Sequence, residues 1–99
     1  MPHILIVEDD IAFGTMLQTW LRKKGFEVDK ATSVGAAVKL LSPNDGVDLV
    51  LSDLRLPDHD GLRLLAWMHE HNIHAPFIVM TNYAEVQNAV LAMKSGAAD

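Results

Sequence analysis

The chain has 99 residues, of which 49% are apolar, and it contains no cysteine. This length and apolar share suit one domain with its own core, and the lack of cysteine excludes disulfides and thiolate metal sites. The formal net charge of −5 disfavours nucleic-acid binding, which depends on clustered Lys and Arg. No apolar run approaches the roughly 20 residues that span a bilayer. We therefore expect a soluble, cytoplasmic protein with one domain over residues 1–99 and no membrane contact.

Three short runs rich in Ile, Val and Leu, and one weaker run, predict strands. Strands that are buried on both faces of a parallel sheet have this composition, because helices cover both of their faces. In chain order, the runs are Ile4–Val7, Phe26–Lys30, Val47–Ser52 and Phe77–Met80.

Helical patterns separate and follow these runs. Apolar residues at i, i+4, i+7 and i+8 predict one buried stripe on the first helix, formed by Phe13, Leu17, Trp20 and Leu21. Basic residues followed by Gly25 predict that this helix ends at Lys24. Three more helices are predicted from the apolar sets Val34/Val38/Leu41, Leu62/Leu65/Met68 and Val86/Val90/Met93. Strands that alternate with helices over short connections indicate an α/β fold with right-handed βαβ units around a parallel sheet.

Acidic residues follow two of the predicted strands. Glu8, Asp9 and Asp10 come directly after the first strand, and Asp53 comes directly after the third. In open α/β sheets the binding crevice lies beyond the carboxyl ends of the strands. Several carboxylates in one crevice favour a hard cation such as Mg²⁺. We therefore expect Glu8, Asp9 and Asp53 to form a magnesium pocket, and we interpret Asp10 as the N-cap of the first helix.

Thr81 follows the last predicted strand. Its hydroxyl could donate to a phosphoryl oxygen in the same crevice. It could equally cap the helix that begins near Ala84. The residue alone leaves both interpretations open.

Three histidines, His69, His71 and His74, lie close together in the sequence. Positions i, i+2 and i+5 do not share one face of a helix, so their side chains are not expected to converge on a metal ion. We expect them to be exposed to solvent.

Four segments together resemble the receiver domain of two-component response regulators, in the order and at the spacing of that family. They are Ile4–Asp10, Leu49–Pro57 with Asp60–Gly61, Ile78–Thr81, and Ala92–Asp99. The resemblance covers essentially the whole chain. It implies a CheY-like, flavodoxin-like doubly wound sheet with the strand order 2-1-3-4-5.

The resemblance also implies roles for individual residues. Asp53 matches the residue that accepts a phosphoryl group from a sensor histidine kinase, and Thr81 matches the hydroxyl that contacts this group. Glu8 and Asp9 match the acidic pair that holds Mg²⁺ together with Asp53, and the main-chain carbonyl of Arg55 matches a further metal ligand. A domain of this kind is a self-phosphorylating switch for an output domain, and no dedicated substrate turnover is expected.

The amino-acid sequences of these segments most resemble those of the receivers of NtrC-type activators of sigma-54-dependent transcription. Relative to the family, the chain stops at Asp99, before a fifth strand with its Lys and a fifth helix. We therefore expect a C-terminally truncated receiver whose strand at Phe77–Met80 is an unpaired edge, open to homodimer formation. We also expect one face of the sheet to be covered by the first helix alone.

Two alternative functions are weighed against this interpretation. A phosphatase with an aspartyl-phosphate intermediate would need a second Asp two positions after Asp53, and Arg55 occupies that position. A receiver-like module that binds partners without being phosphorylated is disfavoured by the complete set of Glu8, Asp9, Asp53 and Thr81, although no Lys stands at the family's position.

Overall fold

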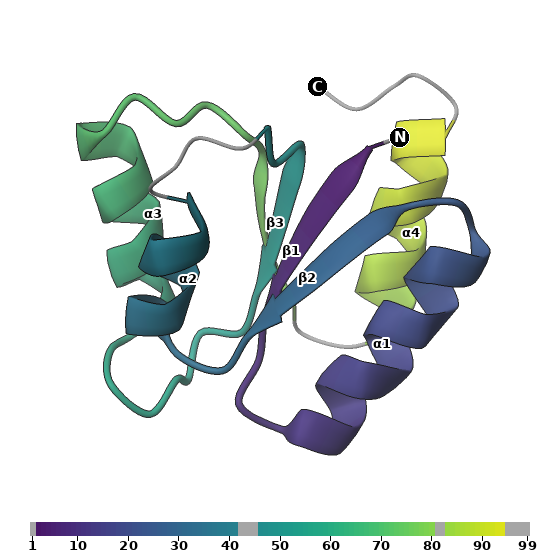
Figure 1. Cartoon of the computed structure of the whole chain (residues 1–99), viewed down its shortest axis with the longest axis horizontal. Helices are drawn as coiled ribbons and strands as arrows, with labels where there is room; N and C mark the ends of the chain where they lie inside the picture. The colour runs from purple at the N-terminus through teal and green to yellow at the C-terminus, as the bar shows by residue number, and fades with distance from the viewer. Residues whose placement is uncertain (1, 42–45, 81–82, 95–99) are drawn as a thin grey trace.

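Strands and helices alternate along the chain, as the sequence predicts (Figure 1). The structure is a computed structural model that describes residues 2–41, 46–80 and 83–94. Within these ranges the strands are β1 (His3–Val7), β2 (Glu27–Ala31), β3 (Leu49–Ser52) and β4 (Phe77–Val79). The helices are α1 (Ile11–Lys23), α2 (Val34–Leu41), α3 (Gly61–Glu70) and α4 (Tyr83–Lys94).

The described strands form one parallel sheet in the order β2-β1-β3-β4. This confirms the predicted α/β fold and the 2-1-3-4 part of the expected order. Three strand starts differ from the prediction, because β1 begins at His3, β2 begins at Glu27 and β3 begins at Leu49. In the register of the sheet, Val7 of β1 is the partner of Ser52 of β3. The carboxyl ends of these two strands therefore lie side by side.

Helices cover both faces of the sheet, with α2 and α3 on one face and α1 and α4 on the other (Figure 1). Successive side chains of a strand point to opposite faces. In β1, Ile4 and Ile6 accordingly pack in the cluster under α1 and α4, whereas Leu5 and Val7 pack in the cluster under α2 and α3. All four side chains are fully buried. Burial on both faces explains why the strand appears in the sequence as a continuous apolar run.

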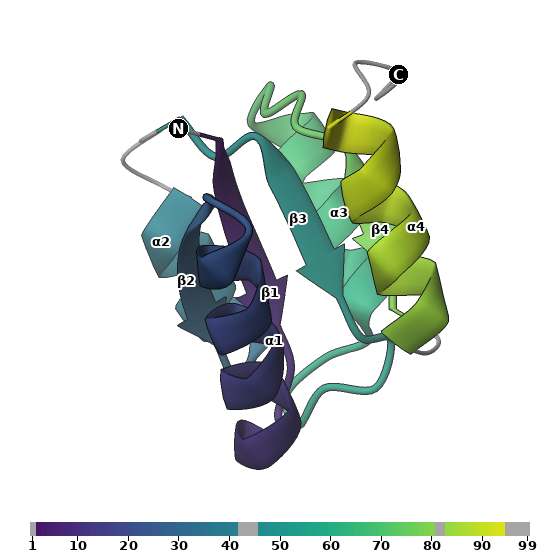
Figure 2. The ribbon, with the colours of Figure 1, turned by 90° about the vertical axis from the view of Figure 1, so that its right-hand side faces the viewer.

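The position of α4 contradicts the expectation that α1 alone covers its face of the sheet. Val86 and Val90 of α4 are buried in the same cluster as Leu17 and Leu21 of α1, and the two helices lie on the same side of the sheet (Figure 2). The right-handed crossover rule constrains a helix that joins two parallel strands, and within the described ranges no strand follows α4. The apolar sheet surface beside α1 therefore decides where this helix packs.

Both ends of α1 follow the sequence prediction. Asp10 is the N-cap, and its Oδ1 accepts the N–H of Phe13 at 3.0 Å. At the other end Lys24 is the C-cap, and Gly25 follows with φ +96°. This left-handed conformation suits glycine, which has no Cβ to clash with the backbone.

α3 buries Met68 as the apolar pattern predicts, but it does not bury Leu62 and Leu65 of the same predicted stripe. Leu62 and Leu65 are 51% and 37% exposed, whereas Leu64 is fully buried and Met68 is 1% exposed. The reason is Gly61, which begins the helix and lies against the backbone at the end of β3. This contact fixes the rotation of the helix, so that positions 61, 64 and 68 face the sheet.

We expect Leu64→Ala to lower the free energy of unfolding by about 2–5 kcal/mol, because it leaves a cavity in the core. Leu62→Ala makes the same chemical change two positions away on the exposed face, and it should stay within about 0.5 kcal/mol of the wild type. Urea unfolding of both variants checks the rotation of α3. Equal losses, or a larger loss for Leu62→Ala, would show that the helix packs through the other stripe.

The N-terminus of α2 is capped from two directions. Ser33, just before the helix, accepts the N–H of Ala36 through its Oγ at 3.1 Å. Asp58, in the loop between β3 and α3, accepts the N–H groups of Val34 and Gly35 through its two carboxylate oxygens, at 3.0 Å and 2.9 Å. The bond from Gly35 is the largest cause that lowers the pKa of Asp58 below its ordinary value of 3.8. The ionised form of Asp58 is thus favoured in the folded chain.

A group whose pKa is lowered on folding adds stability above its unfolded pKa, and this stability is lost as the pH falls through the folded pKa. We therefore expect wild type to be more stable than Asp58→Asn near neutral pH, with a difference that shrinks once the pH falls below 3.8. Asn keeps one acceptor and does not titrate, while every other acid is common to both proteins. Urea unfolding across the acid range measures the difference, and a gap that does not change with pH would contradict the expectation.

Candidate functional site

The sheet fixes the backbone of two acidic residues at its carboxyl edge. Glu8 follows β1 directly, and its N–H donates to the carbonyl of Ala31, the last residue of β2, at 2.9 Å. Asp53 follows β3 directly, and its N–H donates to the carbonyl of Val7 at 2.9 Å. Hydrogen bonds of the strand ladder thus extend to both residues, so their side chains leave the sheet from neighbouring strands.

The structure brings Glu8, Asp9 and Asp53 together. One carboxylate oxygen of each residue lies within 4.8 Å of those of the other two. Glu8 is 9% exposed, Asp53 is partly buried and Asp9 is exposed. Elsewhere in the described ranges, no three His, Asp or Glu side chains meet in this way. The cluster is therefore accessible from solvent on one side and enclosed by the fold on the other.

The cluster gathers the negative charge of three carboxyl groups. Burial raises the pKa of Glu8 above its ordinary value of 4.5, and the nearby Asp9 and Asp53 raise it further. The N–H of Asp10 opposes this shift by donating to Glu8 Oε2 at 3.0 Å. A bound cation would offset the repulsion, and a set of carboxylate oxygens is the donor set that Mg²⁺ prefers. The residues present therefore fit a magnesium ion.

Neighbouring backbone and side-chain groups orient Asp53. The N–H of Arg55 donates to Asp53 Oδ1 at 3.3 Å, and the fully buried Ser52 donates from its Oγ to the Asp53 carbonyl at 2.9 Å. One oxygen of the carboxylate is thereby directed back toward its own loop. Arg55 thus contacts Asp53 through its main-chain N–H.

Gly61 is required by the close approach of α3 to the loop that carries Asp53. A Cβ at this position would overlap the carbonyl oxygen of Asp53 and come within 3.1 Å of Leu54 Cα. The N–H of Gly61 donates to the Leu54 carbonyl at 2.8 Å. The start of α3 therefore presses directly on the backbone that carries Asp53.

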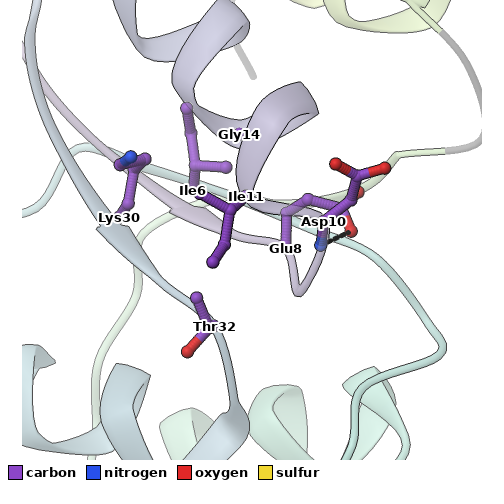
Figure 3. A pocket seen from close by; sticks show the side chains of 7 residues that line it. All are labelled: Ile6, Glu8, Asp10, Ile11, Gly14, Lys30 and Thr32. Carbon is purple, nitrogen blue, oxygen red and sulfur yellow. Dashed lines mark hydrogen bonds between the residues drawn. The ribbon is translucent and has the colours of Figure 1, made fainter.

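A pocket of about 240 Å³ opens beside the cluster, between the start of α1 and β2 (Figure 3). The residues that line it are Ile6, Glu8, Asp10, Ile11, Gly14, Lys30 and Thr32. Glu8 and Asp10 lie together on one side of the pocket, and Ile11, which is 71% exposed, lies beside them (Figure 3). Lys30 is held by a bond from its Nζ to Thr15 Oγ1 at 2.8 Å. Glu8 thus belongs both to this pocket and to the acidic cluster.

The structure leaves one predicted site residue without a description and adds three that the sequence pattern did not indicate. Thr81 lies outside the described residues. The additions are Ser52, Asp58 and Gly61, which all act on the loop that follows β3. Ser52 and Gly61 belonged to recognised segments, but their contacts with Asp53 depend on the folded structure. No local pattern marks Asp58.

The predicted histidine positions are exposed. His69, His71 and His74 do not gather into a group of possible metal ligands among the described residues. His71 instead stacks on Trp67, with ring centroids 4.2 Å apart, and its Nδ1 lies 2.8 Å from the Trp67 carbonyl. This pair closes the C-terminal end of α3.

The fold and the site define an α/β protein with a parallel sheet and a cluster of carboxylates at the carboxyl ends of β1 and β3. The model of the response regulator receiver domain matches residues 4–99, and the chain belongs to this family. The regulatory protein AtoC of Escherichia coli is 41% identical over 97 residues, and the transcriptional regulatory protein ZraR of the same species is 40% identical over 96. These matches cover 98% and 97% of the chain, and they bear out the expected likeness to NtrC-type regulators.

The chain spans about a fifth of the length of these two relatives, 21% and 22%. Among solved structures, the response regulator MaeR bound to beryllium trifluoride is 30% identical, with a TM-score of 0.73. That likeness covers 92% of the chain and 77% of MaeR. Within the described ranges, no helix combines the length and the apolar character needed to cross a membrane.

We expect Gly61→Ala to lower the free energy of unfolding by about 1–3 kcal/mol, because the added methyl group meets backbone atoms that cannot move aside alone. Gly35→Ala is the matched control, since its Cβ would meet only Asp58 Oδ2 at 3.5 Å and Ser33 Oγ at 4.0 Å. In a helix, Gly→Ala without overlap should add about 0.5–1 kcal/mol. Opposite signs in chemical unfolding support the close contact, and a stabilising Gly61→Ala would disprove it.

Proposed function

We propose that this chain accepts a phosphoryl group on Asp53 from a sensor histidine kinase, with Mg²⁺ held by Glu8, Asp9 and Asp53. The observation that supports this most is the convergence of the three carboxylates within 4.8 Å, in a chain that belongs to the receiver family. The binding of beryllium trifluoride by the relative MaeR adds support, because this group resembles a phosphoryl group in shape.

In the proposed reaction, a carboxylate oxygen of Asp53 attacks the phosphorus of a phosphohistidine. The bond from phosphorus to the histidine nitrogen breaks as the new bond to oxygen forms, and the imidazole leaves with the electron pair. Such a transfer depends on in-line positioning and on neutralising oxygen charge. The N–H of Arg55 orients the Asp53 carboxylate, while Ser52 and Gly61 hold its backbone.

The metal site is completed, in this proposal, by the main-chain carbonyl of Arg55. Burial raises the pKa of Glu8 above its ordinary value, and a bound cation would favour the charged form of this carboxylate. When bound, Mg²⁺ stabilises the negative charge on the oxygens of the transferred group. Glu8 and Asp9 thereby serve as metal ligands, and Asp53 serves as both ligand and nucleophile.

Thr81 is proposed to donate its hydroxyl to a phosphoryl oxygen once Asp53 is phosphorylated. It follows Met80 in the sequence, and the N–H of Met80 donates to the carbonyl of Ser52 at 2.9 Å. The described end of β4 thus lies beside the residue that precedes Asp53. A hydrogen bond to a charged acceptor is worth about 1.5–3 kcal/mol, enough to bias a two-state element.

The wider role follows from the family. We infer that phosphorylation switches an output domain, most plainly one that regulates transcription, since AtoC and ZraR are named as regulators. We place this switch in the cytoplasm, without direct contact of this domain with nucleic acid or membrane and without turnover of a separate substrate. Residues 1–99 then act as one receiver domain, for which a homodimer is a possible signalling form.

The test is to treat the purified protein with acetyl phosphate and Mg²⁺ and to measure its intact mass. Wild type should gain one phosphoryl group, and Asp53→Asn should gain none. Asp10→Asn is the matched control, because Asn caps a helix about as well as Asp and Asp10 serves as the N-cap of α1. It should be labelled like wild type.

Two outcomes would contradict the proposal. Labelling of Asp53→Asn would place the phosphoryl group on another residue. A wild-type protein that binds Mg²⁺ but is never labelled would instead indicate a receiver-like module that binds partners without phosphorylation.

A further inference from the structure

The loop between β3 and α3, residues 53–60, carries the groups on which phosphorylation depends. It begins with Asp53, it contains Arg55, whose N–H orients the Asp53 carboxylate, and it ends at Asp60. Asp60 is the N-cap of α3, where its Oδ1 accepts the N–H of Leu62 at 2.8 Å. Arg55 and Asp60 also face each other in an antiparallel bridge. These contacts close the loop upon itself and upon α3.

Asp58 connects the same loop to a different helix. Its two carboxylate oxygens accept the N–H groups of Val34 and Gly35 in the first turn of α2. These residues are 24 and 23 positions away in the sequence, so the contact joins the loop after β3 to the start of the helix that precedes β3. α2 is packed firmly on the sheet, since Val34, Ala37 and Leu41 are buried. The loop is therefore bonded to a fixed point of the scaffold.

The first turn of α2 has a cap of its own. Ser33 accepts the N–H of Ala36 at 3.1 Å through its Oγ, as a local N-cap does. Asp58 and Ser33 thus both satisfy N–H groups of the same helix end. They differ in origin, because Ser33 belongs to the segment that enters α2, whereas Asp58 belongs to the loop of the acceptor.

We propose that Asp58 is a positioning residue for phosphorylation, which holds the acceptor loop on the N-terminus of α2 and so keeps Asp53 and Arg55 in their reactive arrangement. The inference rests on the proposed function of Asp53. It goes beyond that function because the carboxylate of Asp58 bonds to α2 and is not one of the three clustered acids. A small displacement of an attacking group is costly in rate, so a bond three residues from Arg55 has a measurable effect.

The test compares Asp58→Ala with Ser33→Ala in the full 99-residue chain. Both variants remove a cap from α2, but only the first releases the loop. We expect Asp58→Ala to weaken Mg²⁺ binding or slow labelling by acetyl phosphate about tenfold, as the loss of a supporting contact does. Ser33→Ala should stay within about twofold of wild type even where its unfolding midpoint falls as far.

Two further measurements separate positioning from general stability. The amide chemical shift of Arg55 should move in Asp58→Ala and not in Ser33→Ala, because this N–H donates to Asp53. Asp58→Asn keeps one acceptor oxygen, so it should restore part of the labelling rate.

The results also distinguish this inference from the proposed function. If wild type is labelled and Asp58→Ala is labelled at the same rate, or if both variants lose activity in proportion to stability, Asp58 has no positioning role. If wild type itself is not labelled, the proposed function fails and the inference fails with it.

Discussion

The parallel pairing of β1 with β3 is the constraint on which the rest of the structure depends. Val7 and Ser52 are partners in the sheet, so the residues that follow them leave the same edge next to each other. Because both faces of these strands are buried, a shift of the register by one residue would turn their apolar side chains to the wrong faces. Core packing thereby fixes the distance between Glu8 and Asp53. The same forces that stabilise the fold thus assemble the site.

The carboxyl groups of the site repel one another, and Asp9 and Asp53 both act on Glu8. Glu8 is 9% exposed and has two carboxylates beside it, so its pKa is raised rather than lowered. Groups around it keep the geometry in spite of this repulsion: the N–H of Asp10 binds Glu8, and the N–H of Arg55 binds Asp53. An acidic cluster held in this way suits a bound cation, because little reorganisation is needed when the ion arrives.

The loop after β3 must meet three structural requirements within a few residues. Its start must present Asp53, its end must begin α3, and Gly61 must let the helix backbone approach Asp53. Asp58 adds a fourth connection, to α2, with bonds of 3.0 Å and 2.9 Å. A change of charge at Asp53 therefore acts on a segment that is bonded to two helices, which is how a local event can reach a wider part of a domain.

The sequence by itself determined the alternation of strands and helices, both caps of α1 and the gathering of Glu8, Asp9 and Asp53, because periodicity, cap residues and strand-end acids are local signals. Only the tertiary structure decided which leucines of α3 are buried beside Met68, since the sequence pattern favoured Leu62 and Leu65, and the contact of Gly61 selects Leu64. It likewise decided the face that α4 covers and the bond from Asp58 to α2, because both depend on which surfaces meet after the chain has folded.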